Sequence, residues 1–467
     1  MESEGRTHDG ERTLSAYDPA RRGDPHALDD VGVTADGPDR APGTQLPDAP
    51  PAPPAAAAPM SHDAPRGGPF AAMRHRNFAL FYWGQLLSLA GTWMQTTAQG
   101  WLVLELTNNA LLLGLVTAAG SVPIFLFTLY AGVRADRGDK RRIITVAQGV
   151  LMVTALALAV LTQTGRITVP VLLALVFVAG TANAFEVPTR QSFFVELVGR
   201  DDLTNAIALN SSAFNATRIV GPAVAGTFMA TLGVAACFYA NAVSFLFVIA
   251  GLLAMRLPPF VRPVRTASTL EHLREGLGFI RRDRAVRTLV WMIAAMSVLT
   301  FPYAMLLPVF ARDVLHVGAG GLGWMLSASG VGALAAGLAL AAWGHRVPRG
   351  RLLVASACAF SVLLAAFALS RSFPLSLVLL AGVGFTMILN NATTNALLQT
   401  TVPDALRGRV MSVYVFMFLG MTPLGSVQAG AMARWFGAPA ALAIGAAVFL
   451  VLVAWVTFRV PEVRRAR

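Results

Sequence analysis

Apolar segments recur along the chain from Phe78 onward, and short polar stretches separate them. A helix of about 20 apolar residues is long enough to cross a hydrocarbon core of roughly 30 Å. Helices are the expected form, because lipid cannot satisfy the hydrogen-bonding groups of an open backbone. The pattern predicts an all-α membrane protein with twelve transmembrane helices, at residues 78–104, 111–133, 143–162, 168–187, 204–231, 234–255, 287–311, 321–343, 352–370, 374–398, 409–433 and 438–458.

Residues 1–68 follow a different pattern. This segment is poor in large apolar residues and rich in turn formers, with a run of prolines and alanines at 49–59. Such a composition is typical of disordered chain. The segment contains no apolar core of the kind that signal peptides have. We expect a disordered cytoplasmic N-terminal tail, and the simplest interpretation gives it no specific role.

Lysine and arginine are distributed unequally between alternate loops. One set of loops, with the residues after the last span, carries 24 of them, and the opposite set carries 4: Arg166, Arg312, Arg371 and Arg434. Cytoplasmic loops of membrane proteins are enriched in these residues. The bias predicts a multi-pass protein of the plasma membrane with both termini in the cytoplasm, which requires an even number of spans.

A long basic segment, 256–287, divides the spans into two sets of six. We expect an N-terminal six-helix bundle at 70–256, a cytoplasmic linker at 257–286, a C-terminal six-helix bundle at 287–460 and a basic tail at 461–467. Leu270, Leu273, Leu277 and Ile280 recur at helical spacing in the linker and predict an amphipathic helix on the membrane surface.

The two halves share a weak repeat. Asp201-Asp202-Leu203 precedes the fifth span as Asp404-Ala405-Leu406 precedes the eleventh. Repeated halves are typical of transporters whose binding site lies between them.

Composition excludes several classes of protein. Hydrophobic residues make up 55% of the chain, charged residues 13%, and the mean hydropathy is +0.59. A soluble domain carries about 25% charged residues, so this chain is too poor in charge to cover a water-exposed surface. The net charge of +12 is explained by basic loops, and we expect no nucleic acid partner. Cys237 and Cys358 lie in apolar runs, so we expect no disulfide framework, metal site or cofactor.

The most specific local pattern is the mixed-charge stretch between the second and third spans. It contains Gly132, Asp136, Arg137, Lys140 and Arg141 around a tight turn of about nine residues. Gly132 permits close approach of a neighbouring helix, and Asp136 suits a helix N-terminus. The basic residues can pair with carboxylates or lipid phosphates. An ordinary basic cytoplasmic loop is the alternative interpretation.

This stretch resembles the loop-two/three signature of the major facilitator superfamily, in the form found in its enterobactin-exporter and macrolide-efflux branch of drug:proton antiporters and transmembrane secretion effectors. Further stretches are similar to that branch: residues 101–107, 185–191, 218–222, 306–312 and 402–410. The resemblance implies two six-helix bundles that rock around a central cavity. Two departures stand out: the second-half counterpart at 344–351 lacks an acidic residue, and the fourth span, 168–187, has no arginine.

Arg218 is the one basic residue deep inside a predicted span. Because a charge at the bilayer centre costs about 2.5–3.5 kcal/mol, its side chain should face the protein interior. Asn215 precedes it by one turn, and Gly221-Pro222 follows as a helix-kink motif that frees a carbonyl and lets a neighbour approach. Arg218 either attracts an anionic substrate or tunes a carboxylate, or it is a structural strut.

Two spans carry polar stripes that cannot face lipid cheaply. The candidates for a substrate cavity are Gln85, Ser88, Thr92, Gln95 and Gln99 in the first span and Asn390, Asn391 and Thr394 in the tenth. Uncharged polar groups beside large apolar side chains suit an amphiphilic ligand. Hydrogen bonding between helices is the alternative.

Glu105 and Glu186 lie near the ends of their spans. Burial favours the protonated form of a carboxylate, which proton coupling requires, so both are coupling candidates, with an interfacial role as the alternative. The chain has no HExxH or GxxxxGK[ST] motif and no GxGxxG that feeds a nucleotide-binding unit, so we expect neither an enzyme nor an ATP-driven pump.

The favoured function is a secondary transporter that exports drug-like molecules or siderophores by alternating access and proton antiport. Its expected partners are a small-molecule substrate, protons and the lipid bilayer, and we expect a monomer. An importer of a small metabolite with the same fold is the main alternative, and a polytopic enzyme or scaffold is a weaker one.

Overall fold

The computed structural model describes residues 68–257 and 277–462, and all regular secondary structure in this part of the chain is helical. Nearly all of the predicted tail at 1–68, most of the linker at 257–286 and most of the basic tail at 461–467 lie outside the described residues. The transmembrane helices are α1 (Arg76–Thr107), α2 (Ala110–Arg137), α3 (Lys140–Gln163), α4 (Val169–Val198), α5 (Leu203–Thr231), α6 (Val234–Ala254), α8 (Arg284–Leu299), α9 (Tyr303–Val309), α10 (Gly318–Trp343), α11 (Arg349–Leu369), α12 (Phe373–Thr401), α13 (Asp404–Gly420), α14 (Thr422–Phe436) and α15 (Ala438–Arg459).

The predicted spans are confirmed as helices. In the described chain, 10 segments are long and apolar enough to cross a membrane, with α8–α9 and α13–α14 each forming one such segment. Helices α1 and α5, with 32 and 29 residues, are also long enough, but their Gln, Thr, Ser and Asn side chains lower their hydropathy. With these two helices the described chain has the twelve crossing segments that the sequence predicts.

Two spans that were predicted as continuous helices are broken. The seventh changes direction between α8 and α9 at Pro302, and it ends in a π-helical turn at Phe310–Val314. The eleventh breaks between α13 and α14 at Met421, just before Pro423. Proline has no N–H to continue the backbone ladder, which explains both positions.

The predicted loop of about nine residues between the second and third spans is wrong. Helix α2 continues to Arg137, and Gly138 and Asp139 alone connect it to α3. Asp139, rather than Asp136, caps the following helix, because its Oδ1 accepts the Arg142 backbone N–H at 3.1 Å. Gly132 lies inside α2 with open space where a side chain would stand, so it permits no close approach here.

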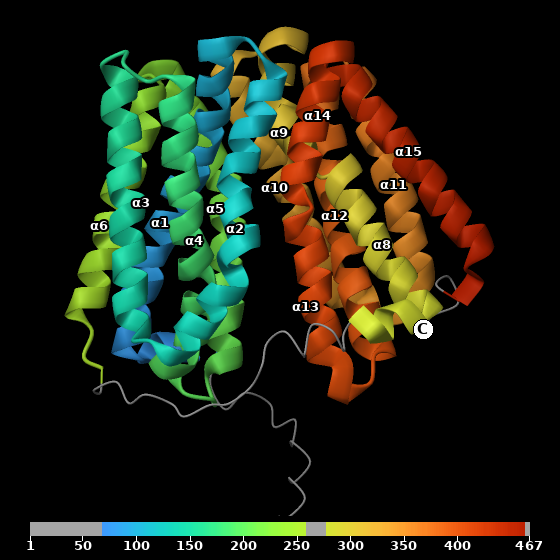
Figure 1. The fold of residues 1–467 in the computed structure, drawn as a ribbon, viewed down its shortest axis with the longest axis horizontal. Coiled ribbons are helices and arrows are strands. Elements are labelled where there is room, and N and C mark those ends of the chain that lie inside the picture. The colour runs from blue at the N-terminus through green and yellow to red at the C-terminus, as the bar shows by residue number, and fades with distance from the viewer. Residues whose placement is uncertain (1–67, 258–276, 463–467) are drawn as a thin grey trace, which may run out of the picture. The chain divides into compact units, whose positions relative to one another are not determined.

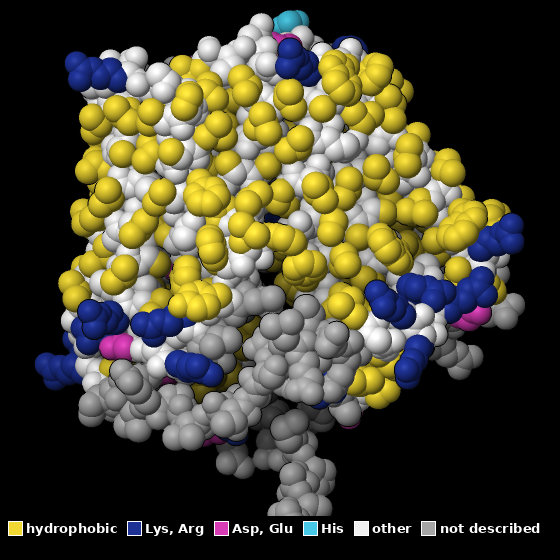
Figure 2. All heavy atoms as spheres, viewed as in Figure 1, with side chains coloured by type: hydrophobic (Ala, Val, Ile, Leu, Met, Phe, Trp, Pro, Cys, Tyr) yellow, Lys and Arg dark blue, Asp and Glu magenta, His cyan; other side chains and the backbone are white. Residues whose placement is uncertain are grey.

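The helices form two groups, α1–α6 and α8–α15 (Figure 1). Helices α5 and α2 of the first group pack on α10 and α14 of the second. We call the side where α1 begins and α15 ends the basic face, and the side where α1 ends the far face. Figure 2 shows hydrophobic side chains over the flank of the helices, with lysine and arginine gathered along its lower edge, the basic face. This distribution is what a bilayer-spanning protein requires.

Candidate functional site

Small residues bring the two groups into contact at the far face. A side-chain carbon at Gly323 of α10 would lie 2.5 Å from the carbonyl oxygen of Pro222 on α5, and one at Gly226 of α5 would lie 3.0 Å from the Ala319 carbonyl oxygen of α10. The hydroxyl of Ser327, one turn further along α10, donates to the Ile219 carbonyl at 2.6 Å. Glycine thus permits direct backbone contact between the groups.

One row of residues on α10 contacts α5 near the far face and leaves it nearer the basic face. Gly323, Ser327 and Gly330 pack on α5, whereas the next members of the same row, Leu334 and Leu338, are 39% and 64% exposed. The second contact behaves in the same way: Gly114 of α2 packs on Ser426 of α14, and the contact extends to the rings of Phe125 and Phe416, near mid-helix. In the described chain the groups therefore meet in the far half of the protein.

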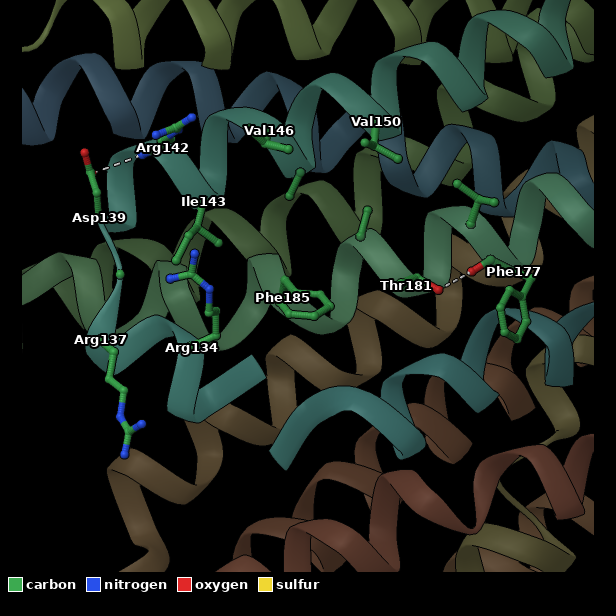
Figure 3. Close-up of a pocket in the computed structure, with 14 residues that line it drawn as sticks. Arg134, Arg137, Asp139, Arg142, Ile143, Val146, Val150, Phe177, Thr181 and Phe185 are labelled. Atoms are coloured by element: carbon green, nitrogen blue, oxygen red, sulfur yellow. Dashed lines mark hydrogen bonds between the residues drawn. The ribbon is translucent and has the colours of Figure 1, made fainter. Parts of the chain in front are cut away.

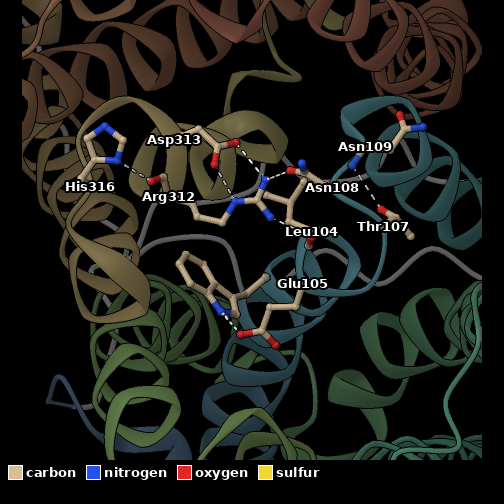
Figure 4. Close-up of polar contacts among 9 residues, drawn as sticks. Leu104, Glu105, Thr107, Asn108, Asn109, Arg312, Asp313 and His316 are labelled. Carbon is tan, nitrogen blue, oxygen red and sulfur yellow. Dashed lines mark hydrogen bonds and ion pairs between the residues drawn. The ribbon is translucent and has the colours of Figure 1, made fainter.

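An arginine joins the two groups at the far face (Figure 4). Arg312 Nη1 donates to the Leu104 carbonyl at 2.7 Å, and Nη2 donates to the Asn108 side-chain oxygen. Asp313 accepts from Nε at 2.6 Å and from Nη2 at 3.0 Å, and so fixes the guanidinium plane. We call Arg312, the Leu104 carbonyl and Asn108 the far-face latch. The negative end of the α1 dipole adds to the attraction.

A cavity of about 330 Å³ lies between the groups beneath these contacts. Both groups contribute to its wall: Trp93, Thr96, Thr97, Gln99, Gly100, Leu113, Val116, Thr117, Gly120, Ser121 and Val176 from the first, and Phe301, Pro302, Ala304, Met305, Pro308, Leu326, Thr422 and Ser426 from the second. Large apolar side chains alternate with hydroxyl and amide groups in this wall. Such a lining suits an amphiphilic small molecule.

The predicted polar stripe of α1 divides between this cavity and the first group's interior. Gln99 lines the cavity, and Thr92 is exposed. Gln85 and Ser88 are buried, and Gln95 accepts from the Asn241 amide of α6 at 2.7 Å. The stripe therefore divides between a cavity wall and hydrogen bonding between helices, and its role in substrate binding stays a prediction.

Polar residues of α12 form hydrogen bonds within α12 and to the neighbouring helix α11. Asn390 is buried and donates to the Leu353 carbonyl of α11 at 3.4 Å, and the Thr394 hydroxyl donates to the Asn390 carbonyl at 2.8 Å. The side-chain oxygen of Asn391 is buried and has no partner among the described residues. A cavity role for this cluster stays a prediction.

Arg218 lies on the side of α5 between the residues that face α1 and those that face α10. Gly221 packs against Trp93 of α1, which confirms that this glycine lets a neighbour approach, and Ile219 contacts α10. Arg218 is half-buried, and its guanidinium has no hydrogen bond or ion pair within residues 68–257 and 277–462. Asn215 donates to the Ser211 carbonyl instead of contacting Arg218. Trp93 also lines the cavity, whereas Arg218 is not among the lining residues, so its predicted cavity role stays a prediction.

Glu186 is buried in an ion pair that sequence reasoning missed. Helix α4 continues to Val198, beyond the predicted end at 187, and so includes Arg190. Arg190 Nε donates to Glu186 Oε1 at 2.8 Å, and the Gln148 amide donates to the same oxygen at 3.4 Å. The spacing of four residues between acid and base was the available signal. The fourth helix therefore carries an arginine, although the predicted span 168–187 has none.

The remaining predicted residues lie at the two faces. Glu105 is exposed at the far end of α1, where its carboxylate accepts from the Trp101 indole at 2.6 Å. At the basic face Lys140 pairs with Glu196, and Arg141 donates to the Leu253 carbonyl at 3.0 Å. The Asp136 side chain lies outside the described residues.

Comparison with known proteins gives the family. Residues 67–467 match the family model described as transmembrane secretion effector. The chain is 29% identical to the multidrug efflux pump Tap of Mycolicibacterium fortuitum, over 76% of this chain and 88% of that protein. It is 24% identical to the enterobactin exporter EntS of Shigella flexneri, over 82% of this chain and 94% of that protein.

A solved structure shows the same fold. The nucleoside transporter NupG, in the structure of a mutant form, superposes with a TM-score of 0.69 at 14% identity and covers 83% of this chain and all of that one. The family match over residues 67–467 spans both groups of six crossing segments. The chain belongs to the transmembrane secretion effector family of the major facilitator superfamily and is a multi-pass membrane transporter of small molecules.

Proposed function

We propose that this transporter exports small amphiphilic molecules, drug-like compounds or siderophores, across the plasma membrane by alternating access and proton antiport. One observation carries the proposal. A mixed apolar and polar cavity lies between the two groups, closed on the far face by glycine contacts and the far-face latch. With the basic face in the cytoplasm, this is the state that receives a substrate from inside the cell.

Relatives support the direction of transport. Tap is named as an efflux pump and EntS as an exporter. Glu186 is the candidate for proton coupling, because it is a carboxylate buried inside the N-terminal group, where it contacts Gln148 of α3 and Arg190 of α4. Import through the same cavity is the second candidate.

Transport in oriented vesicles tests the proposal. A fluorescent amphiphile should accumulate in everted vesicles that contain the protein when their interior is acidic, and an uncoupler should abolish the accumulation. Vesicles without the protein are the control. Accumulation in right-side-out vesicles instead would establish import. Initial rates that an uncoupler leaves unchanged would rule out proton antiport.

Replacement of Arg218 tests the cavity. We expect Arg218→Ala and Arg218→Lys both to reduce efflux, alanine more severely, because lysine keeps the charge but loses the planar set of five donors. Efflux is measured per amount of folded protein in the membrane. Normal transport by Arg218→Ala would show that the guanidinium is dispensable. Failure of both variants to fold would assign Arg218 a structural role.

A further inference from the structure

A groove of about 1150 Å³ runs along the side of the N-terminal group, between α3 and α4 (Figure 3). It lies apart from the central cavity, since the two share no lining residue. The groove ends at the turn Gly138–Asp139, on the basic face. It therefore opens toward the surrounding bilayer.

The long wall of this groove is apolar. Val146 and Val150 line it from α3, one turn apart, and Phe177 and Val178 line it from α4. All four side chains are exposed, and Val146 is 61% exposed. From the start of α3 at Lys140 to Val150 the helix rises about 15 Å, which is half of a hydrocarbon core of roughly 30 Å. The wall thus has the length of one acyl leaflet.

The end of the groove at the basic face is cationic. Arg134 and Arg137 stand in the last turn of α2, and Arg142 stands in the first turn of α3. Within residues 68–257 and 277–462, none of these guanidiniums is paired with a carboxylate. Asp139 shares the rim, but its Oδ1 accepts the Arg142 backbone N–H. Among the described residues that line the groove, three cations and one anion give this end a net positive charge.

We propose that this groove binds one anionic phospholipid. Its phosphate lies among Arg134, Arg137 and Arg142, and an acyl chain lies along Val146, Val150 and Phe177. Guanidinium groups bind phosphate oxygens with directed hydrogen bonds, and basic pockets between transmembrane helices bind acidic headgroups. A zwitterionic lipid fills the apolar wall equally well but brings no net charge to the rim. The bound lipid joins the two sides of the α2–α3 turn.

Native mass spectrometry of the purified full chain tests this site. Phosphatidylglycerol and phosphatidylcholine with the same acyl chains are the probes. We expect retention of one phosphatidylglycerol and a loss of affinity of roughly 30-fold in the double variant Arg134→Gln/Arg142→Gln, since each basic residue near a headgroup contributes a factor of about 5. The double variant Arg166→Gln/Arg371→Gln removes the same charge from far-face loops and should bind like wild type.

Further arms separate the outcomes. The variant Arg134→Lys/Arg142→Lys keeps the charge and should retain most of the binding, and it serves as the folded reference if the glutamine variant unfolds. Glycerol phosphate, which has the headgroup charge without acyl chains, should not displace the lipid. Equal retention of both phospholipids, unchanged binding in the glutamine variant, or displacement by glycerol phosphate would overturn the proposal.

Discussion

Leucine in place of Gly323 should abolish transport and leave the protein folded. A side-chain carbon at this position would meet the Pro222 carbonyl at 2.5 Å, a backbone atom that cannot turn away. Overpacking a close contact costs typically 1–3 kcal/mol, and 3 kcal/mol lowers the population of the closed far face by more than about 100-fold. The protein would then remain open to the far side. Initial efflux rate per folded molecule is the measurement.

Helix α10 supplies its own control. Gly337 lies on the same helix with nothing within 4 Å of a built side-chain carbon. We expect Gly337→Leu to transport normally, so that any loss in Gly323→Leu reflects the contact rather than helix propensity or membrane insertion. Full transport by Gly323→Leu would show that the two groups do not need this approach.

Glutamine in place of Glu186 should uncouple transport from protons. The change removes the carboxylate charge that pairs with Arg190 and keeps an amide oxygen that can still accept from Gln148. It also leaves the Arg190 guanidinium, whose side chain is 13% exposed, without its carboxylate, and loss of one partner of a buried pair costs roughly 3–5 kcal/mol in proteins. We expect a loss of pH-driven efflux together with reduced thermal stability, measured in vesicles and in detergent respectively.

A second substitution separates coupling from stability. The double variant Glu186→Gln/Arg190→Gln restores charge balance and should recover stability but not proton-driven efflux. Recovery of both would make Glu186 a structural partner only. Glu196 lies on α4, like Glu186, and pairs with Lys140 of α3. Glu196→Gln is the control and should cost about 1 kcal/mol or less, since the Glu196 side chain is 43% exposed.

Much of the fold could be predicted from the sequence because a bilayer imposes a length on each apolar segment. The same reliance on apolar segments hides where the helices end. Hydropathy shows where lipid contact ends and not where a helix ends, so it predicts a fourth span that stops at 187 and leaves Arg190 in a loop, whereas α4 continues to Val198. Likewise α2 continues as helix through its charged last turn, where the sequence suggested a loop.

The candidate site was predicted less completely, because it depends on which helices meet. The polar stripe of α1 has helical spacing, and that spacing gives its direction but not its neighbours. Gln95 therefore could not be assigned to Asn241 before α6 was placed beside it. Gly323 and Gly114 carry no chemical signal of their own, and their importance arises from the backbone that faces them.

The far-face latch combines two side chains with one main-chain carbonyl. Arg312 and Asn108 are encoded residues, but the Leu104 carbonyl is present whatever side chain stands at that position. A genetic screen for variants that fail to close the far face should therefore collect changes at Arg312 and Asn108 and pass over most changes at Leu104. The first half of the chain can then vary in sequence at Leu104, while Arg312 and Asn108 maintain the contact.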